Sequence, residues 1–94
     1  MTSPQTGFRQ RLSAREQMLG TVVKLTAPQV IEILGEAGLD FVMIDAEHAP
    51  FDRNAIDLAL LAARAAGIHG LVRVPDMGSI LSALDCGAAG VIVR

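Results

Sequence analysis

Four short apolar segments recur along the chain, and the segments between them have the hydrophobic spacing of helices. The apolar segments are Thr21–Leu25, Phe41–Ile44, Leu71–Val74 and Val91–Val93. They are rich in β-branched or large apolar residues and lack clean alternation with polar ones, as is typical of strands buried on both faces. This order of strands and helices predicts parallel strands joined by right-handed crossovers.

Residues that favour helix starts precede the two longer helical segments. Thr26 and Gln29 form a capping-box pattern, and Pro28 falls in the first turn, where its missing N–H costs little. Asp52 can cap the second of these helices. We therefore expect helices to begin directly after Thr26 and directly after Asp52.

Two shorter helices complete the predicted order. Ser79–Asp85 has apolar residues at helical spacing, and Phe8–Gln17 is expected to form a helix ahead of the first strand. Glycine just past a helix supplies the left-handed conformation that ends it. The three helices between strands are each followed by such a glycine: Gly38, Gly67 and Gly87.

This order of elements fits either a doubly wound sheet or a (β/α)8 barrel. A complete barrel typically needs about 250 residues, so the 94 residues present would hold only its first four strands. On their own, the first and fourth strands would be open edges with unpaired backbone groups. We therefore expect the sequence to be part of a longer protein.

Composition narrows the function classes. Hydrophobic residues make up 51% of the chain and charged residues 19%, which is typical of a domain with a buried core. The net charge of −2 and the absence of Trp and Tyr speak against nucleic-acid binding. No apolar segment is long enough to cross a membrane, and no glycine-rich loop for a nucleotide is present. The single cysteine, Cys86, allows no intrachain disulfide and fits a cytoplasmic location.

Residues suited to catalysis directly follow the second apolar segment. Asp45, Glu47 and His48 lie within four residues, and Pro50 then ends any strand pairing. In parallel α/β proteins, catalytic residues collect in the loops at the C-terminal ends of strands. His48 is a candidate general base, because an imidazole can take up a proton near neutral pH. Asp45 could orient it or hydrogen-bond a metal-bound water, and Glu47 could do either of these or support the loop.

Arg73 lies inside the otherwise apolar third segment, and a charge in such a place needs a reason. Its guanidinium could stabilise an anionic oxygen, or it could pair with a nearby acid. Three other residues receive structural interpretations. His69 falls in a helix-to-strand turn, Cys86 is expected to be a small buried group, and Met43 is expected to lie in the core.

Several segments, in order, carry a resemblance to a known family. They are Leu19–Leu25, Glu32–Leu34 with Ala37–Phe41, Ile44–Pro50, Leu71–Pro75 and Leu84–Ala88. Together they resemble the metal-dependent class II pyruvate aldolases, the hydroxy-oxo-acid aldolase family. The most specific part is the Asp-x-Glu-His-x-Pro motif followed by Val-Arg-x-Pro, and the similarity covers nearly the whole chain after Phe8.

The resemblance implies a (β/α)8 barrel instead of a doubly wound sheet, assembled as a homohexamer. Residues 1–18 would form an N-terminal arm and helix, and residues 19–94 the N-terminal half of the barrel. The implied activity is a carbon–carbon lyase that cleaves 4-hydroxy-2-oxo acids to pyruvate or a close analogue plus an aldehyde. A small 2-oxo acid would be the substrate, and a divalent metal (Mg2+, Mn2+ or Co2+) would be required.

The matching motifs allow residue roles to be transferred from the family. His48 would help to remove the proton from the 4-hydroxyl group, and Arg73 would offset the charge of the enolate. Asp85 matches the family aspartate that raises the basicity of the histidine, although a simple barrel places the end of this helix on the far face. Asp45 and Glu47 would support these groups.

The family's metal ligands lie on later strands, beyond residue 94, and Arg94 stands where a proline is usual. Residues 1–94 alone are therefore expected to be inactive. Glu47 and His48 are not expected to be direct ligands, because adjacent side chains on extended backbone point in opposite directions. Two alternatives stay open: a related lyase that cleaves citramalyl- or citryl-type thioesters, and a non-catalytic half-barrel.

Overall fold

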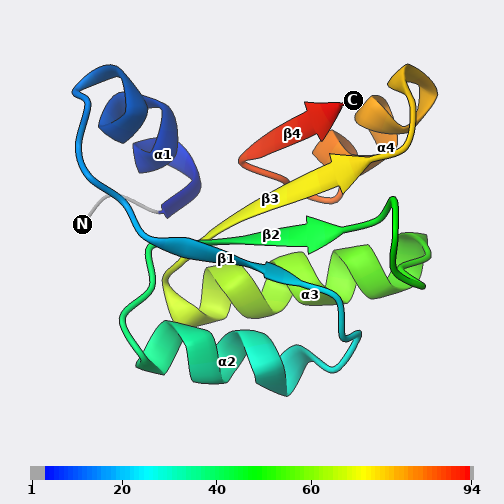
Figure 1. The fold of residues 1–94 in the computed structure, drawn as a ribbon, viewed down its shortest axis with the longest axis horizontal. Coiled ribbons are helices and arrows are strands. Elements are labelled where there is room, and N and C mark those ends of the chain that lie inside the picture. The colour runs from blue at the N-terminus through cyan, green and yellow to red at the C-terminus, as the bar shows by residue number, and fades with distance from the viewer. Residues whose placement is uncertain (1–3, 94) are drawn as a thin grey trace.

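The structure, a computed structural model, describes residues 4–93 and confirms the predicted alternation of strands and helices (Figure 1). In chain order, the elements are α1 (Pro4–Ser13), β1 (Gly20–Val23), α2 (Pro28–Glu36), β2 (Phe41–Asp45), α3 (Arg53–Ala66), β3 (His69–Val74), the 3-10 turn η1 (Met77–Ser79), α4 (Ile80–Asp85) and β4 (Gly90–Val93). The domain division expected at residue 18 falls in the segment between α1 and β1.

The strands form one parallel sheet, in which each strand pairs with the next along the chain in the order β1-β2-β3-β4. Helices α2 and α3 lie side by side against one face of this sheet (Figure 1). Because every crossover returns the chain to the same end, the C-terminal ends of all four strands meet at one edge. Among residues 4–93, none of the helices has the length and apolarity needed to cross a bilayer.

The hydrophobic core lies between the sheet and helices α2 and α3. Val42, Ile44 and Val72 project from the strands toward the helices and are fully buried. Leu60 of α3 is equally buried, and a Cβ atom added at Gly70 would lie 2.6 Å from its Cδ2 atom. Glycine therefore allows α3 to approach β3 closely. Burial of one leucine side chain stabilises the fold by about 2 kcal/mol.

The other face of the sheet is only partly covered. Val22 of β1 and Ile92 of β4 are 43% and 39% exposed. The expectation that all the strands are buried on both faces is therefore wrong for the two outer strands. The reason is that α1 is the single helix of the described chain that packs on this side, and it reaches only one end of the strands (Figure 1).

Helix α1 covers the end of the sheet where β2 and β3 begin. The ring of Phe8 lies 6.3 Å from the ring of Phe41 and 4.9 Å from that of His69, measured between ring centroids. Arg11 donates a hydrogen bond to Asp40 at 2.7 Å, and its Nη1 atom lies 3.1 Å from Nε2 of His69. His69 is therefore buried at the strand starts, away from the C-terminal edge, in agreement with a structural role.

Helix α1 begins and ends earlier than the predicted helix Phe8–Gln17. It ends at Ser13 because Arg15 adopts a positive φ of 56°, in the left-handed region that terminates helices. The N–H of Arg15 donates to the carbonyl of Leu12 at 3.0 Å and closes this last turn. Arginine has no intrinsic preference for that conformation, so the sequence gives no signal for the stop.

The predicted cap of α3 is confirmed, because Asp52 Oδ1 accepts a hydrogen bond from the N–H of Ala55 at 2.8 Å. The three predicted helix-ending glycines are confirmed as well. Their φ values are 87° at Gly38, 76° at Gly67 and 97° at Gly87. These left-handed residues end the helices and turn the chain back toward the next strand.

The predicted cap at Thr26 is wrong. Ala27 occupies the N-cap position of α2 and makes no side-chain capping bond. Pro28 is the first helical residue, and its ring favours an extended conformation at the residue before it, so the helix begins after Ala27. The predicted helix Ser79–Asp85 also differs at its start, where η1 precedes α4 and Asp76 caps that turn through the N–H of Ser79 at 2.9 Å.

We predict that residues 1–94, purified alone, self-associate. Val22 and Ile92 expose apolar surface, and β1 and β4 each have an unpaired edge. The double variant Val22→Lys, Ile92→Lys should reduce the associated fraction, measured by light scattering at several concentrations. Asn54→Lys on the exposed side of α3 is the control, because it adds a positive charge without removing apolar surface, and it should leave association unchanged. A wild-type chain that stays monomeric at every concentration would contradict this prediction.

Candidate active site

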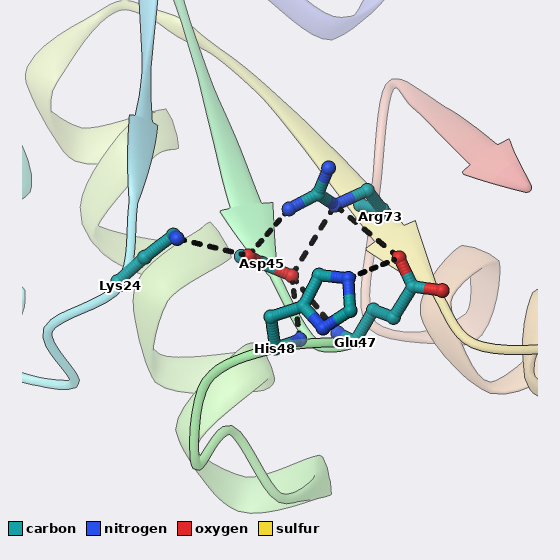
Figure 2. Close-up of polar contacts among 5 residues, drawn as sticks. All are labelled: Lys24, Asp45, Glu47, His48 and Arg73. Carbon is teal, nitrogen blue, oxygen red and sulfur yellow. Dashed lines mark hydrogen bonds and ion pairs between the residues drawn. The ribbon is translucent and has the colours of Figure 1, made fainter. Parts of the chain in front are cut away.

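Five polar side chains meet at the C-terminal ends of β1, β2 and β3 (Figure 2). Lys24 directly follows β1, Asp45 ends β2, and Arg73 lies one residue before the end of β3. Glu47 and His48 come from the turn that follows β2. Because the strands are parallel and adjacent, residues that are distant in the chain come together at this edge.

An ion pair between Asp45 and Arg73 lies at the centre of the cluster. The register of β2 and β3 places the two residues directly opposite one another. Arg73 donates from Nη2 to Asp45 Oδ2 at 2.6 Å and from Nε to Oδ1 at 3.3 Å. The Asp45 side chain is 0% exposed and that of Arg73 is 23% exposed. A buried carboxylate needs a partner, and paired N–H donors from one guanidinium also fix its orientation.

Asp45 also shapes the turn that follows its own strand. The backbone N–H groups of Glu47 and His48 donate to Asp45 Oδ1 at 3.0 Å and 2.9 Å, as in an Asx-turn. Hydrogen bonding from Arg73 is the largest cause that holds the pKa of Asp45 well below its ordinary value. Burial opposes this shift, and the two backbone N–H groups add to it. Asp45 is therefore a fixed negative charge at neutral pH.

The side chains of Glu47 and His48 lie together. Nε2 of His48 is 3.1 Å from Oε1 of Glu47, and Nε of Arg73 is 3.7 Å from the same oxygen. The expectation that these adjacent side chains diverge is wrong, because the hydrogen bonds to Asp45 bend the backbone into a turn. The Glu47 side chain is 14% exposed and that of His48 is 49% exposed, so the imidazole faces the open side of the cluster.

This arrangement presents two groups suited to chemistry. The exposed imidazole of His48 can exchange a proton with a bound molecule. Within residues 4–93, Nη1 of Arg73 has no hydrogen-bond acceptor, and Figure 2 shows it directed away from Asp45 and Glu47. That nitrogen can donate to an anionic oxygen, while Asp45 holds the guanidinium in place beforehand, as preorganised stabilisation of charge requires.

The structure does not bring Asp85 into this cluster. Asp85 ends α4 and lines a cleft on the helix side of the sheet together with Arg53, Asp57 and Cys86. The hydrogen bond from Arg53 to Ser82 at 3.0 Å shows that α3 and α4 are neighbours there. The role assigned to Asp85 through the family stays a prediction. Cys86 is 6% exposed, which confirms its interpretation as a small buried group.

Lys24 is the one member of the cluster that the sequence analysis missed. Its Nζ atom lies 4.0 Å from Asp45 Oδ2, and its side chain is 61% exposed. The observed register pairs Val23 with Ile44, so the next residues along are Lys24 and Asp45. The sequence did not reveal this neighbour, because the predicted segment continues to Leu25, and aligning Leu25 with Ile44 would place Thr26 beside Asp45.

The described residues do not form a metal site. No group of three or more His, Cys, Asp or Glu side chains within residues 4–93 has the geometry to hold a metal ion. Both carboxylate oxygens of Asp45 accept hydrogen bonds from Arg73. Asp45 therefore fits a role in positioning Arg73 and does not fit direct ligation of a cation.

Comparison with known families agrees with this geometry. Residues 19–93 match the family described as HpcH/HpaI aldolase/citrate lyase. The chain belongs to this family. The resemblance inferred from the motifs is therefore confirmed, and the proteins of this family to which the chain is similar include aldolases.

Individual relatives give the extent of the similarity. A hydroxypyruvate/pyruvate aldolase of Roseobacter denitrificans is 34% identical over 95 residues, which cover 99% of this chain and 37% of the relative. Among solved structures, the HpcH/HpaI aldolase from Desulfitobacterium hafniense matches with a TM-score of 0.81 at 36% identity, covering 89% of this chain and 34% of that one. The citrate synthase SbnG matches with a TM-score of 0.86 at 34% identity, covering 92% and 36%.

The chain thus spans little more than a third of the length of these relatives. Its parallel sheet and helices correspond to one part of the barrel of this family. Of the two predicted architectures, the (β/α)8 barrel is therefore confirmed and the doubly wound sheet is wrong. The partly exposed face that carries Val22 and Ile92 is the face that points into such a barrel.

We predict that Asp45→Asn destabilises the fold by about 3 kcal/mol, because it leaves the partly buried Arg73 without its counter-charge. The pKa of Asp45 is lower in the folded than in the unfolded chain. Its stabilisation is therefore complete above a pH of about 4 and declines as the pH falls toward the folded-state value. Urea unfolding at a series of acidic pH values should show that the free energy of unfolding falls less steeply with falling pH in the variant than in the wild type. Asp57→Asn on the exposed side of α3 is the control, and equal acid sensitivity of wild type and Asp45→Asn would contradict the prediction.

Proposed function

We propose that this chain supplies the first part of the active site of a metal-dependent carbon–carbon lyase, within a complete (β/α)8 barrel. The substrate class is 4-hydroxy-2-oxo acids, which are cleaved to pyruvate or a close analogue such as hydroxypyruvate plus an aldehyde. The observation that carries this proposal is the cluster of Asp45, His48 and Arg73 at the C-terminal edge of the sheet, in a chain of an aldolase/citrate lyase family.

Cleavage needs one group that takes a proton and one that stabilises the resulting enolate. His48 takes the proton of the 4-hydroxyl group, and Glu47 orients its imidazole through the 3.1 Å contact. The bond between the third and fourth carbons then breaks. Its electron pair passes into the enolate of the 2-oxo acid, and the hydroxyl-bearing carbon becomes the aldehyde. Arg73, held by Asp45, donates to the enolate oxygen. A proton delivered to the third carbon then converts the enolate into the free 2-oxo acid and completes the reaction. In the reverse direction the same groups serve aldol addition.

A divalent cation (Mg2+, Mn2+ or Co2+) belongs to this proposal. Residues 4–93 do not offer a ligand set for it, so we assign its ligands to chain outside them. When bound, such an ion would act as a Lewis acid on the 2-oxo group. We further propose a cytoplasmic homo-oligomer, a hexamer by resemblance to the family.

A related lyase that acts on citryl- or citramalyl-type thioesters is the second candidate. The family description names citrate lyase beside aldolase, and one similar structure is a citrate synthase. Both candidates break a carbon–carbon bond beside a carbon that bears an oxygen, and both require a stabilised enolate. The assay below separates them, because only one of them uses a thioester.

We predict that the full-length protein releases pyruvate from 4-hydroxy-2-oxo acids, measured by coupling to lactate dehydrogenase. EDTA should abolish the release, and Mn2+ or Mg2+ should restore it, because the proposed cation stabilises the enolate. Residues 1–94 alone should show none. Cleavage of citramalyl-type thioesters alone would favour the second candidate, and no cleavage of either substrate would indicate a non-catalytic barrel.

We predict that His48→Ala lowers kcat of the full-length protein by about 100- to 10,000-fold, the usual contribution of a positioned acid–base group. The pH profile of kcat should lose the limb that reports the histidine, and added imidazole should restore part of the rate. Circular dichroism on the same sample establishes that the variant is folded. Retro-aldol rates near those of the wild type would remove His48 from this role.

A further inference from the structure

Lys24 lies at the rim of the site, and its contacts within the fold do not explain why a lysine occupies this position. Its ammonium is 4.0 Å from Asp45 Oδ2, which is beyond hydrogen-bond distance. We propose that Lys24 binds a carboxylate group of the substrate and thereby contributes to substrate selection. This inference rests on the proposed lyase function and adds to it a named recognition residue.

The carboxylate of Asp45 is already satisfied without Lys24. Its Oδ1 atom accepts from two backbone N–H groups and from Arg73 Nε, and its Oδ2 atom accepts from Arg73 Nη2 at 2.6 Å. An additional long ion pair to an exposed ammonium contributes little to stability, typically below about 1 kcal/mol. The position of Lys24 is therefore not explained by the fold.

The side chains of the cluster also leave a use for a second cation. Arg73 and Asp45 form an ion pair, and Glu47 places a second carboxylate beside them. Lys24 adds a positive charge that attracts an anionic oxo acid, and its 61% exposed side chain can move toward a ligand. Its ammonium has three donors and a flexible stem, which suits a carboxylate that approaches from the open side.

The strand order places the two cations on opposite sides of Asp45. Lys24 follows β1, Asp45 ends β2 and Arg73 lies on β3. Figure 2 shows both cations directed toward the same carboxylate from opposite sides. Lys24 Nζ and Arg73 Nη2 lie 4.0 Å and 2.6 Å from the same atom, Asp45 Oδ2, so the two cationic groups are close together. A small substrate can therefore place its enolate oxygen at Arg73 and a carboxylate at Lys24 at the same time.

Two carboxylates could occupy this position, that of the 2-oxo acid itself or one carried by the aldehyde. Aldol addition of pyruvate to succinic semialdehyde and to butanal separates these sources, because the two aldehydes have equal chain length and differ in the acid group. The variants are Lys24→Met, Lys24→Arg and the control Arg9→Met, all in the full-length protein. Arg9 lies on α1, at the opposite end of the sheet from the cluster.

We expect Lys24→Met to lower kcat/KM by about 10- to 100-fold, the effect of losing one charge-assisted hydrogen bond. The loss should fall mainly on KM, and Lys24→Arg should recover most of it because the positive charge is retained. A loss confined to succinic semialdehyde assigns Lys24 to the carboxylate of the aldehyde. An equal loss with both aldehydes, expressed in the KM for pyruvate, assigns it to the oxo acid. Either result supports carboxylate binding.

An effect of Lys24→Met no larger than that of Arg9→Met would overturn the proposal. A covalent adduct of pyruvate trapped on Lys24 by borohydride would also overturn it, since it would replace an ionic role by a covalent one. Calorimetric binding of oxalate, which resembles the oxo acid, and of succinate, which carries the acid group of the aldehyde, to wild type and Lys24→Met tests both sources without turnover. If turnover is absent but binding of either anion depends on Lys24, the lyase function alone is contradicted. If the substitution changes the binding of neither anion, the role of Lys24 is contradicted.

Discussion

The buried carboxylate of Asp45 is the constraint on which the site depends. A charge with no exposed surface requires partners, and the register of β2 and β3 supplies one in Arg73. The Oδ1 atom of Asp45 also accepts hydrogen bonds from the backbone N–H groups of Glu47 and His48. One side chain therefore fixes a guanidinium, a turn and, through that turn, an imidazole. The cluster is a consequence of strand pairing plus the need to satisfy one buried anion.

The fold was largely predictable because its signals are local. Apolar segments of β-branched residues, an acidic cap at Asp52 and the helix-ending glycines act within a few residues, and each had its expected effect. The errors arose where a distant or competing influence decided the outcome. Pro28 moved the N-cap position from Thr26 to Ala27. Arg15 ended α1 early by adopting a left-handed conformation, which the conformational preference of arginine does not predict.

Most members of the site were predictable, but their contacts were not. Asp45, Glu47, His48 and Arg73 could be named because they follow or end apolar strands, but their pairing depends on register, which a sequence fixes only through the assembled sheet. Lys24 was missed for that reason. Asp85 is the opposite case, a residue that was predicted for the site but lies outside the cluster. A match to a family motif does not tell on which face of the sheet the end of a helix lies, and Asp85 lies on the face covered by helices.

The bonding of the turn to Asp45 has a mechanical consequence. Segments that act as lids are held by few contacts, so that they can open and close at low energetic cost. The backbone of Glu47 and His48 is instead fastened to a side chain that is itself locked into the sheet by Arg73. The imidazole is therefore carried by a rigid platform, and any gating of ligand access has to come from other segments of the barrel.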